Sequence, residues 1–220
     1  MTRGTFITLE GGEGVGKSTQ IKLLASWLQR AGVEVLTLRE PGGTPVGDRI
    51  RTLLLDPAHE GMHPRAELLL YEASRAELVG SVIAPALERG AFVVCDRFCD
   101  SSTAYQAYGR ELPLGEVLEM NRLATGGLEP DLTLILDLDP IEGVRRATAT
   151  DGADRLEAEG AEFHRRVRAG FLTIAALDPG RCRIVDACGT PEEVAGAVLA
   201  AALTLPAVAV LSAIAADGAR

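Results

Sequence analysis

The feature that most constrains this chain is the segment GGEGVGKS, residues 11–18, which joins a run typical of a strand to a run typical of a helix. Residues 6–9, FITL, are apolar and favour a buried strand, whereas residues 18–30 carry apolar side chains at the spacing of one helix face. Glycines let the backbone turn so that its N–H groups converge, and the start of the helix adds partial positive charge. The segment therefore predicts a cradle for phosphate groups.

The spacing of this segment matches G-x-x-x-x-G-K-[ST], the P-loop motif, in the strand-to-helix context that makes the motif specific. A Gly-rich turn with a chance lysine is the alternative. In the P-loop interpretation Lys17 reaches the β- and γ-phosphates of a nucleoside triphosphate, and the Ser18 hydroxyl binds Mg²⁺. We expect ATP to contact Gly11, Gly12, Glu13, Gly14, Val15, Gly16, Lys17, Ser18 and Thr19.

Strand-like and helix-like runs alternate along the rest of the chain. The expected strands are residues 6–9, 33–38, 92–95, 132–138 and 183–185. The expected helices are residues 18–30, 48–55, 66–89, 114–124, 159–177 and 191–202. This alternation predicts an α/β fold, a parallel β-sheet flanked by helices on both faces, of the P-loop NTPase type with a short lid.

The length of the chain is typical of one α/β domain. The chain has 220 residues and a net charge of −9, so we expect no nucleic-acid partner. Its cysteines and histidines show no metal-ligand spacing, and no signal peptide is evident.

Residues 194–216 are uncharged and long enough to span a bilayer, but they lack aromatic or basic anchors. We expect a single P-loop domain over residues 1–205, a flexible apolar tail over 206–220, and no membrane association.

The second part expected of a nucleotide site is an acidic residue at the end of a neighbouring apolar strand. FVVCDR ends in Asp96 and Arg97, and an aspartate after a buried strand can hold Mg²⁺ directly or through water. LILDLDP offers Asp137 and Asp139 instead, but the adjacent cation at Arg97 could bridge two phosphate groups. We therefore expect Asp96 to share the metal with Ser18.

A P-loop alone does not distinguish a switch GTPase, a motor or partition ATPase, and a small-molecule kinase. The chain has no N-K-x-D segment for reading guanine and no second lysine in the loop. It does place arginines near the ends of expected elements, which favours a second phosphate site and hence a nucleoside monophosphate kinase. These are Arg39, Arg51, Arg75, Arg97, Arg145, Arg146 and Arg155.

From residue 5 to about residue 203 the sequence closely resembles the bacterial thymidylate kinase family. The matching segments are EGGEGVGKST, REPGGTPVGDRIRTLLLD, AELLLYEASRAELV, VVCDRFCDSSTAYQAYGR, PDLTLILDLDP, DRLE and VDACGTPEEV. The resemblance implies a cytoplasmic homodimer that phosphorylates dTMP to dTDP with Mg·ATP, by in-line transfer of the γ-phosphoryl group, in dTTP biosynthesis. It leaves open a family member with impaired catalysis or with another acceptor such as dUMP.

The resemblance also implies a dTMP site. Glu13 would lie near the sugar, and Arg51 and Arg97 would hold the acceptor phosphate; without the resemblance, Arg51 is better explained as an exposed helix charge. Tyr71, where the family often has phenylalanine, would stack on thymine; a core aromatic is the alternative. The implied dTMP contacts are Glu13, Arg39, Glu40, Arg51, Tyr71, Arg75, Arg97, Ser102, Tyr105 and Gln106.

Residues 140–160 would form the lid over ATP, closing water out of the site. Many family members without a P-loop arginine carry arginines just before DR in this lid, whereas this chain has Thr148 and Thr150 there. We expect Arg155 to join the transition-state clamp and Arg145 or Arg146, preferably Arg146, to pack near the adenine. The expected catalytic set is Lys17, Asp96, Arg97 and Arg155.

Overall fold

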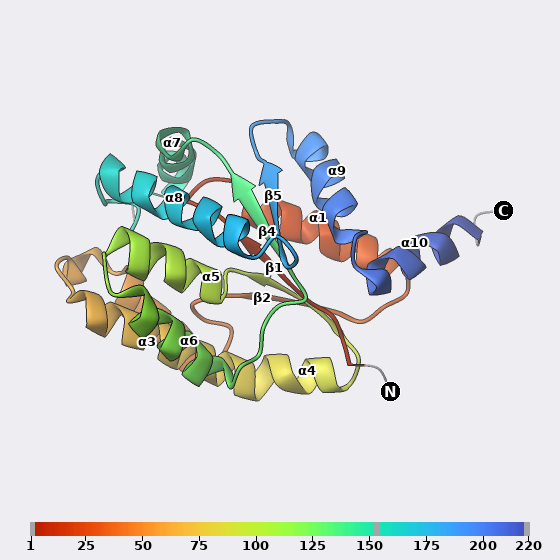
Figure 1. Cartoon of the computed structure of the whole chain (residues 1–220), viewed down its shortest axis with the longest axis horizontal. Helices are drawn as coiled ribbons and strands as arrows, with labels where there is room; N and C mark the ends of the chain where they lie inside the picture. The colour runs from red at the N-terminus through yellow and green to blue at the C-terminus, as the bar shows by residue number, and fades with distance from the viewer. Residues whose placement is uncertain (1–2, 152–154, 218–220) are drawn as a thin grey trace.

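A five-stranded parallel sheet, in the order β2-β3-β1-β4-β5, forms the centre of the computed structural model, which describes residues 3–151 and 155–217. Figure 1 shows helices packed against both faces of this sheet. The strands are β1 (Phe6–Glu10), β2 (Val35–Arg39), β3 (Phe92–Asp96), β4 (Leu132–Asp137) and β5 (Cys182–Asp186). The helices are α1 (Lys17–Arg30), α2 (Pro45–Leu55), α3 (Pro64–Leu78), α4 (Ala84–Glu88), α5 (Cys99–Ser102), α6 (Leu114–Thr125), α7 (Pro140–Asp151), α8 (Ala161–Leu177), α9 (Pro191–Ala202) and α10 (Pro206–Asp217).

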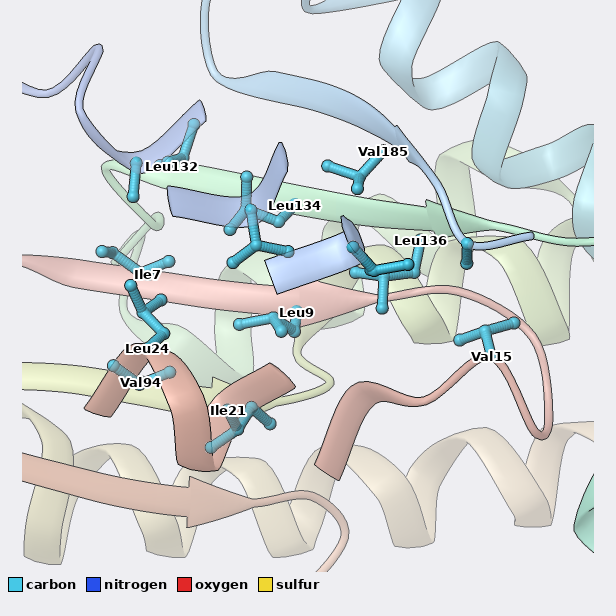
Figure 2. Packing of buried hydrophobic residues seen from close by; sticks show 14 of the residues in the cluster. Ile7, Leu9, Val15, Ile21, Leu24, Val94, Leu132, Leu134, Leu136 and Val185 are labelled. Carbon is cyan, nitrogen blue, oxygen red and sulfur yellow. The ribbon is translucent and has the colours of Figure 1, made fainter. Parts of the chain in front are cut away.

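Alternate residues of the buried strands face two separate cores. On one face, Ile7, Leu9 and Leu134 pack against Ile21 and Leu24 of α1, as Figure 2 shows, and against α9. The opposite face is covered by the end of α3, by α4 and by α8. Because both faces are buried, the strands read as continuous apolar runs, and the predicted α/β fold class is confirmed.

Two predicted helices differ from the observed ones by more than one or two residues at an end. Helix α2 begins three residues before the predicted start, since the Thr44 hydroxyl accepts a hydrogen bond from the Gly47 N–H and Pro45 occupies the first turn. The predicted helix over residues 66–89 contains a π-helical segment, Val79–Ile83 (η2), between α3 and α4. Pro85 has no N–H and its ring disfavours the regular turn before it, which accounts for the widened turn.

The segment from α5 to a second π-helical stretch, η3 (Thr103–Gly109), was not predicted as helical. Nearly all of its residues are buried between α6 and α8, so its sequence shows no alternation of polar and apolar faces. Without that alternation, the pattern that reveals a surface helix is lost. This segment directly follows Asp96 and Arg97 and therefore borders the predicted site.

The C-terminal residues that we expected to form a flexible tail include helix α10, and Val208 on that helix is fully buried in the core around α1 and α9. Residues 218–220 lie outside the described part of the chain. Within the described ranges, no single helix is long and apolar enough to cross a membrane. Helices α9 and Pro206–Ser212 meet the length and hydropathy test only as a pair, and they are bent by 115° relative to one another.

The buried carboxylate of Glu10 ties the end of β1 to the chain after β3. Its Oε1 accepts the Phe98 N–H at 2.7 Å, and its Oε2 accepts the Ser101 hydroxyl at 2.5 Å. The Ser101 oxygen in turn accepts a hydrogen bond from Arg97. Burial first, and then the nearby Asp100, raise the pKa of Glu10 to about 8, against the opposing effects of Ser101 and Arg97.

We predict that Val208→Ala lowers the free energy of unfolding by about 1–2 kcal/mol, because it removes buried methyl groups from the core. Urea denaturation gives the measurement. The matched control is Val210→Ala on the same helix, whose side chain is 58% exposed and whose substitution should change stability by no more than about 0.5 kcal/mol. Equal effects of the two substitutions would contradict the packing of α10.

We predict that the contribution of Glu10 to the free energy of unfolding falls as pH rises. The folded protein keeps on Glu10 a proton that the unfolded chain releases above its ordinary pKa of 4.5, so the stabilisation is full below 4.5 and is lost as pH approaches 8. The unfolding free energy of the wild type minus that of Glu10→Gln should fall by more than about 1.4 kcal/mol, the value of one pKa unit, between about pH 5 and about pH 8. A difference that stays constant with pH would refute this.

Candidate functional site

The P-loop connects β1 to α1 and holds three glycines at positive φ: Gly11 at 129°, Gly14 at 62° and Gly16 at 93°. A Cβ on Gly14 would collide with the carbonyl oxygen of Gly143 at the start of α7. A Cβ on Gly143 would collide in the same way with the carbonyl of Glu13. Glycine at both positions therefore lets the first turn of α7 lie directly against the P-loop.

Lys17, the first residue of α1, folds its side chain back over this loop. Its Nζ donates to the carbonyl oxygens of Gly12 at 2.7 Å and Gly11 at 3.2 Å. Burial lowers the pKa of Lys17, and the neighbouring Arg97 lowers it further. An anionic phosphate beside this ammonium group would favour its charged form, which is the chemistry expected of a P-loop lysine.

Ser18 and Asp96, the two residues expected to share the metal, lie together at the carboxyl edge of the sheet. The Ser18 hydroxyl donates to Asp96 Oδ2 at 3.2 Å, and Asp96 Oδ1 is buried without a hydrogen-bond partner. Among the described residues, no cluster of three acidic, histidine or cysteine side chains could hold a metal without other ligands. A hydroxyl and an unpartnered carboxylate oxygen fit Mg²⁺, which takes its other ligands from phosphates and water.

A cavity of about 390 Å³, which we call the loop cavity, opens beside the P-loop. It collects residues from the loop, the ends of β2 and β3, α2 and α7. Its lining residues are Glu13, Gly14, Val15, Gly16, Lys17, Ser18, Thr19, Arg39, Glu40, Arg51, Asp96, Arg97, Arg146, Ala147 and Glu157.

A smaller pocket of about 80 Å³, the side pocket, adjoins the loop cavity. Its lining residues are Glu13, Glu40, Pro41, Arg51, Leu55, Tyr71, Arg75, Arg97, Ser101, Ser102, Tyr105, Gln106 and Leu156. The two hollows share Glu13, Glu40, Arg51 and Arg97. Two carboxylates and two guanidinium groups therefore stand where one hollow passes into the other.

Arg97 is held at this junction by several contacts. One Nη donates to the carbonyl of Gly11 at 2.9 Å, and the other forms an ion pair with Glu13 at 2.8 Å. The guanidinium also lies over the ring of Tyr105, whose hydroxyl donates to Glu13 at 2.5 Å. Burial acts to raise the pKa of Glu13, but Arg97, Lys17 and Tyr105 outweigh it and hold that pKa at about 2. Glu13 is thus a fixed anion.

Arg75 lies in the wall of the side pocket with its side chain 1% exposed. Its guanidinium donates to Glu40, Glu72, Ser102, Asn121 and the carbonyl oxygen of Phe98. Burial raises the pKa of Glu40 to about 7 although Arg75 acts against it, and Glu40 Oε1 is buried without a partner. Arg75 on α3 and Glu40 after β2 are therefore joined into one buried network.

The lid arginines take different positions. Arg146 lines the loop cavity and donates to Glu142, whereas Arg145 is 71% exposed. The structure does not bring Arg155 to this cavity. Its Nε donates to the carbonyl of Leu54, and its Nη1 pairs with the buried carboxylate of Glu67.

The two threonines of the expected lid, Thr148 and Thr150, are described only in part. The hydroxyl of Thr148 donates to the carbonyl of Val144 within α7. The side chain of Thr150 and residues 152–154 of the expected lid lie outside the described part of the chain.

Sequence reasoning missed three residues that support the site: Glu10, Glu67 and Arg110. Glu10 ends a buried strand, and Glu67 lies one helical turn before Tyr71 on the inward face of α3. The signal that could have revealed both is a charged residue at a position expected to face the core, where charged side chains are rare unless they are paired. Arg110 pairs with both Glu67 and Glu159, contacts that no local pattern reveals.

Comparisons with known proteins identify the family of this chain. The family model described as thymidylate kinase matches residues 9–198. A thymidylate kinase of Synechococcus sp. (strain JA-3-3Ab) is 55% identical over 195 residues, which cover 88% of this chain and 92% of that protein. The thymidylate kinase of Deinococcus radiodurans is 51% identical over 201 residues, which cover 91% and 97% of the two chains.

The crystal structure of thymidylate kinase from Ehrlichia chaffeensis superposes with a TM-score of 0.76 at 34% identity, and the match covers 92% of this chain and 99% of that one. The agreement therefore extends from the P-loop to α9 in sequence and over nearly the whole fold. The resemblance identified from the motifs is confirmed, and this chain belongs to the thymidylate kinase family.

Proposed function

We propose that the chain phosphorylates dTMP to dTDP, with ATP in the loop cavity as the donor and dTMP in the side pocket as the acceptor. The observation that carries this proposal is the junction between the two hollows, where Arg51 and Arg97 line both. Two arginines at that point can bind the acceptor phosphate and the γ-phosphate together, which brings the reacting oxygen to the phosphorus.

In this arrangement the chemistry needs positioning and charge neutralisation, and no protein nucleophile. Lys17 and the P-loop amides would bind the β- and γ-phosphates, while Arg97 neutralises charge that develops on the transferred group. Mg²⁺, held by Ser18 and Asp96 directly or through water, would draw charge from the phosphate oxygens when bound. Glu13, fixed as an anion, is placed to accept a hydrogen bond from the sugar 3′-hydroxyl.

The side pocket has the residues that a thymine base requires. Tyr71 offers an aromatic face for stacking, and Ser102, Tyr105 and Gln106 supply polar edges. The N–H groups of Arg75 already donate to protein acceptors. We therefore propose that its main role is to hold the pocket wall in shape, and that a hydrogen bond to a pyrimidine carbonyl is its second role. At the mouth of the loop cavity, Arg39 is placed to meet phosphate charge.

We propose that residues 140–160 act as the lid of a kinase domain whose core continues past residue 205 to Val208 on α10. Support comes from α7, which lies against the P-loop through Gly143 and brings Arg146 and Ala147 to the loop cavity. We assign the ATP-facing role in the lid to Arg146. A closed lid would exclude water from the transferred phosphoryl group.

The direct test is a panel of nucleoside monophosphates assayed with Mg·ATP, measuring ADP release with and without each acceptor. We expect rapid ADP release with dTMP and very little without an acceptor. Equal ADP release in the presence and absence of every monophosphate would instead indicate a switch or partition ATPase and reject the proposal.

We also propose that the chain forms a homodimer through α2, α3 and α6. Helix α3 packs against both α2 and α6, and each of the three carries an exposed leucine: Leu53 at 46%, Leu69 at 57% and Leu118 at 49%. Figure 1 shows α3 and α6 side by side at the lower left. We further place the protein in the cytoplasm, a reducing compartment, because its four cysteines are free thiols.

We predict that Tyr71→Ala raises KM for dTMP far more than KM for ATP. Loss of base stacking is worth about 1–3 kcal/mol, which corresponds to a rise in KM of roughly five- to 150-fold. Steady-state kinetics with each substrate varied in turn give the measurement. A matched control is Tyr108→Ala, since Tyr108 lines neither hollow. If both KM values rise equally in Tyr71→Ala, the stacking assignment is wrong.

We predict that Leu118→Glu converts the dimer to a monomer, because a carboxylate in an apolar interface would lose its hydration. Light scattering after size-exclusion chromatography measures the mass. Leu177→Glu on α8 is the control, since Leu177 is 74% exposed on a different helix and should leave the dimer intact. A wild type that elutes as a monomer would reject the interface altogether.

A further inference from the structure

The carboxylate of Glu67 on α3 is completely buried and binds three side chains, two from η3 and its C-terminal cap and one from the end of the proposed lid. Oε1 accepts the Gln106 amide nitrogen at 2.8 Å and Arg110 Nε at 3.2 Å. Oε2 accepts Arg110 Nη2 at 3.1 Å and pairs with Arg155 Nη1 at 2.5 Å. Both oxygens are thus used fully by the protein, and Glu67 lines neither the side pocket nor the loop cavity.

One arm of this cluster anchors the end of the proposed lid. Arg155 is 4% exposed on its side chain, and it is held by Glu67 and by the carbonyl of Leu54. The next residue, Leu156, forms part of the wall of the side pocket, and Glu157 lines the loop cavity. The contact between Glu67 and Arg155 therefore fixes the stretch of chain that borders both hollows.

Arg110 strengthens the same anchor. Besides its two hydrogen bonds to Glu67, it pairs with Glu159 at 2.5 Å and lies over the ring of Phe163 at the start of α8. The cluster contains two arginines and two carboxylates, so its charges balance. Removing one carboxylate would leave a buried guanidinium without its counter-ion, which is strongly unfavourable.

The other arm fixes the orientation of a residue in the side pocket. The side chain of Gln106 is 1% exposed and lines this pocket. An ionised carboxylate only accepts hydrogen bonds, so Glu67 holds the NH₂ group of the Gln106 amide. The amide oxygen is then the atom left for a ligand. Thymine N3 carries a hydrogen and can donate to that oxygen, whereas cytosine N3 is an acceptor and cannot.

We propose that Glu67 is a positioning residue that couples the lid to the base pocket and selects a base with a donor at N3. Through Arg155 it holds Leu156 in the wall of the side pocket. Through Gln106 it determines whether an amide oxygen or an NH₂ group faces the base. The proposal rests on the placement of dTMP in the side pocket proposed above. It adds a residue that never touches the substrate but determines which base the pocket accepts.

Glu67→Gln is the informative substitution, because it keeps shape and removes charge. The amide oxygen at position 67 is drawn to the arginines, which leaves an NH₂ group facing Gln106 and favours the flipped amide there. We expect KM for dTMP to rise roughly tenfold or more, KM for ATP to rise by a smaller factor because Glu157 of the same stretch lines the loop cavity, and the ratio of kcat/KM for dTMP to that for dCMP to fall by about tenfold or more.

Arg155→Met separates the two arms, since Glu67 keeps Arg110 and Gln106 as partners. This variant should raise KM for dTMP but leave the ratio of dTMP to dCMP unchanged, because Gln106 stays oriented. The double variant should raise KM for dTMP by less than the product of the two single effects, since both disrupt the same ion pair. The control is Glu34→Gln, which removes an exposed ion pair with Arg89 and should alter none of these values.

An unchanged ratio of dTMP to dCMP in folded Glu67→Gln would overturn the Gln106 arm, and multiplicative effects in the double variant would overturn the lid arm. If Glu67→Gln does not fold, hydrogen exchange of the wild type decides: dTMP should slow exchange at the amides of residues 155–159, and no slowing would refute the coupling. Tyr71→Ala keeps the two proposals apart. A normal KM for dTMP in Tyr71→Ala would contradict the placement of dTMP in the side pocket. A raised KM for dTMP in Tyr71→Ala, together with a normal KM for dTMP in Glu67→Gln, would contradict only the role of Glu67.

Discussion

The ion pair between Glu13 and Arg97 is the contact on which the site depends. Parallel strands end at one edge of the sheet, and β1 and β3 are neighbours there, so the P-loop after β1 and the chain after β3 must meet. Arg97 takes a left-handed backbone conformation, with φ of 70°, and its N–H donates to the carbonyl of Leu9. Its guanidinium then crosses to Gly11 and Glu13 and stands between the two hollows. A straight continuation of β3 would carry this cation away from the P-loop.

The site concentrates positive charge in a chain whose net charge is −9. Arginines that would repel one another are each matched by a buried or half-buried carboxylate: Arg97 by Glu13, Arg75 by Glu40 and Glu72, and Arg155 by Glu67. These pairs hold the guanidinium groups in place and offset the cost of removing them from water. Arg51 and Arg146, at the wall of the loop cavity, complete the cationic surface that phosphate groups would meet. The acidic composition and an anion-binding site are therefore compatible, since the compensation is local.

Local features of the fold could be predicted from the sequence, and contacts between distant segments could not. The P-loop and the strands follow from runs of a few residues in which each choice agrees with its neighbours. The pairing of Ser18 with Asp96 is an exception, because the P-loop motif calls for an acidic partner although the two residues lie 78 positions apart. Arg155 shows the limit. The family resemblance implied that it belongs to a lid beside ATP, but its Nε donates to the carbonyl of Leu54, 101 residues earlier, and its charge is paired with Glu67 on α3. The π-helical segment after α5 was missed for a related reason. It is buried on all sides, and burial on all sides removes the periodic signal that a surface helix would give.

A buried cluster such as that around Glu67 requires a functional explanation, because apolar residues of similar volume are often as stabilising as a buried ion pair. Apolar packing could hold the end of the lid against α3. It could not distinguish the two ends of the Gln106 amide, which have nearly the same shape and differ only in whether they donate or accept. A carboxylate makes that distinction because it accepts only. The same carboxylate also holds Arg155, so the lid end and the base-reading amide share one anion and neither can lose it without affecting the other. On this reasoning, the charge of Glu67 is retained for orientation rather than for stability.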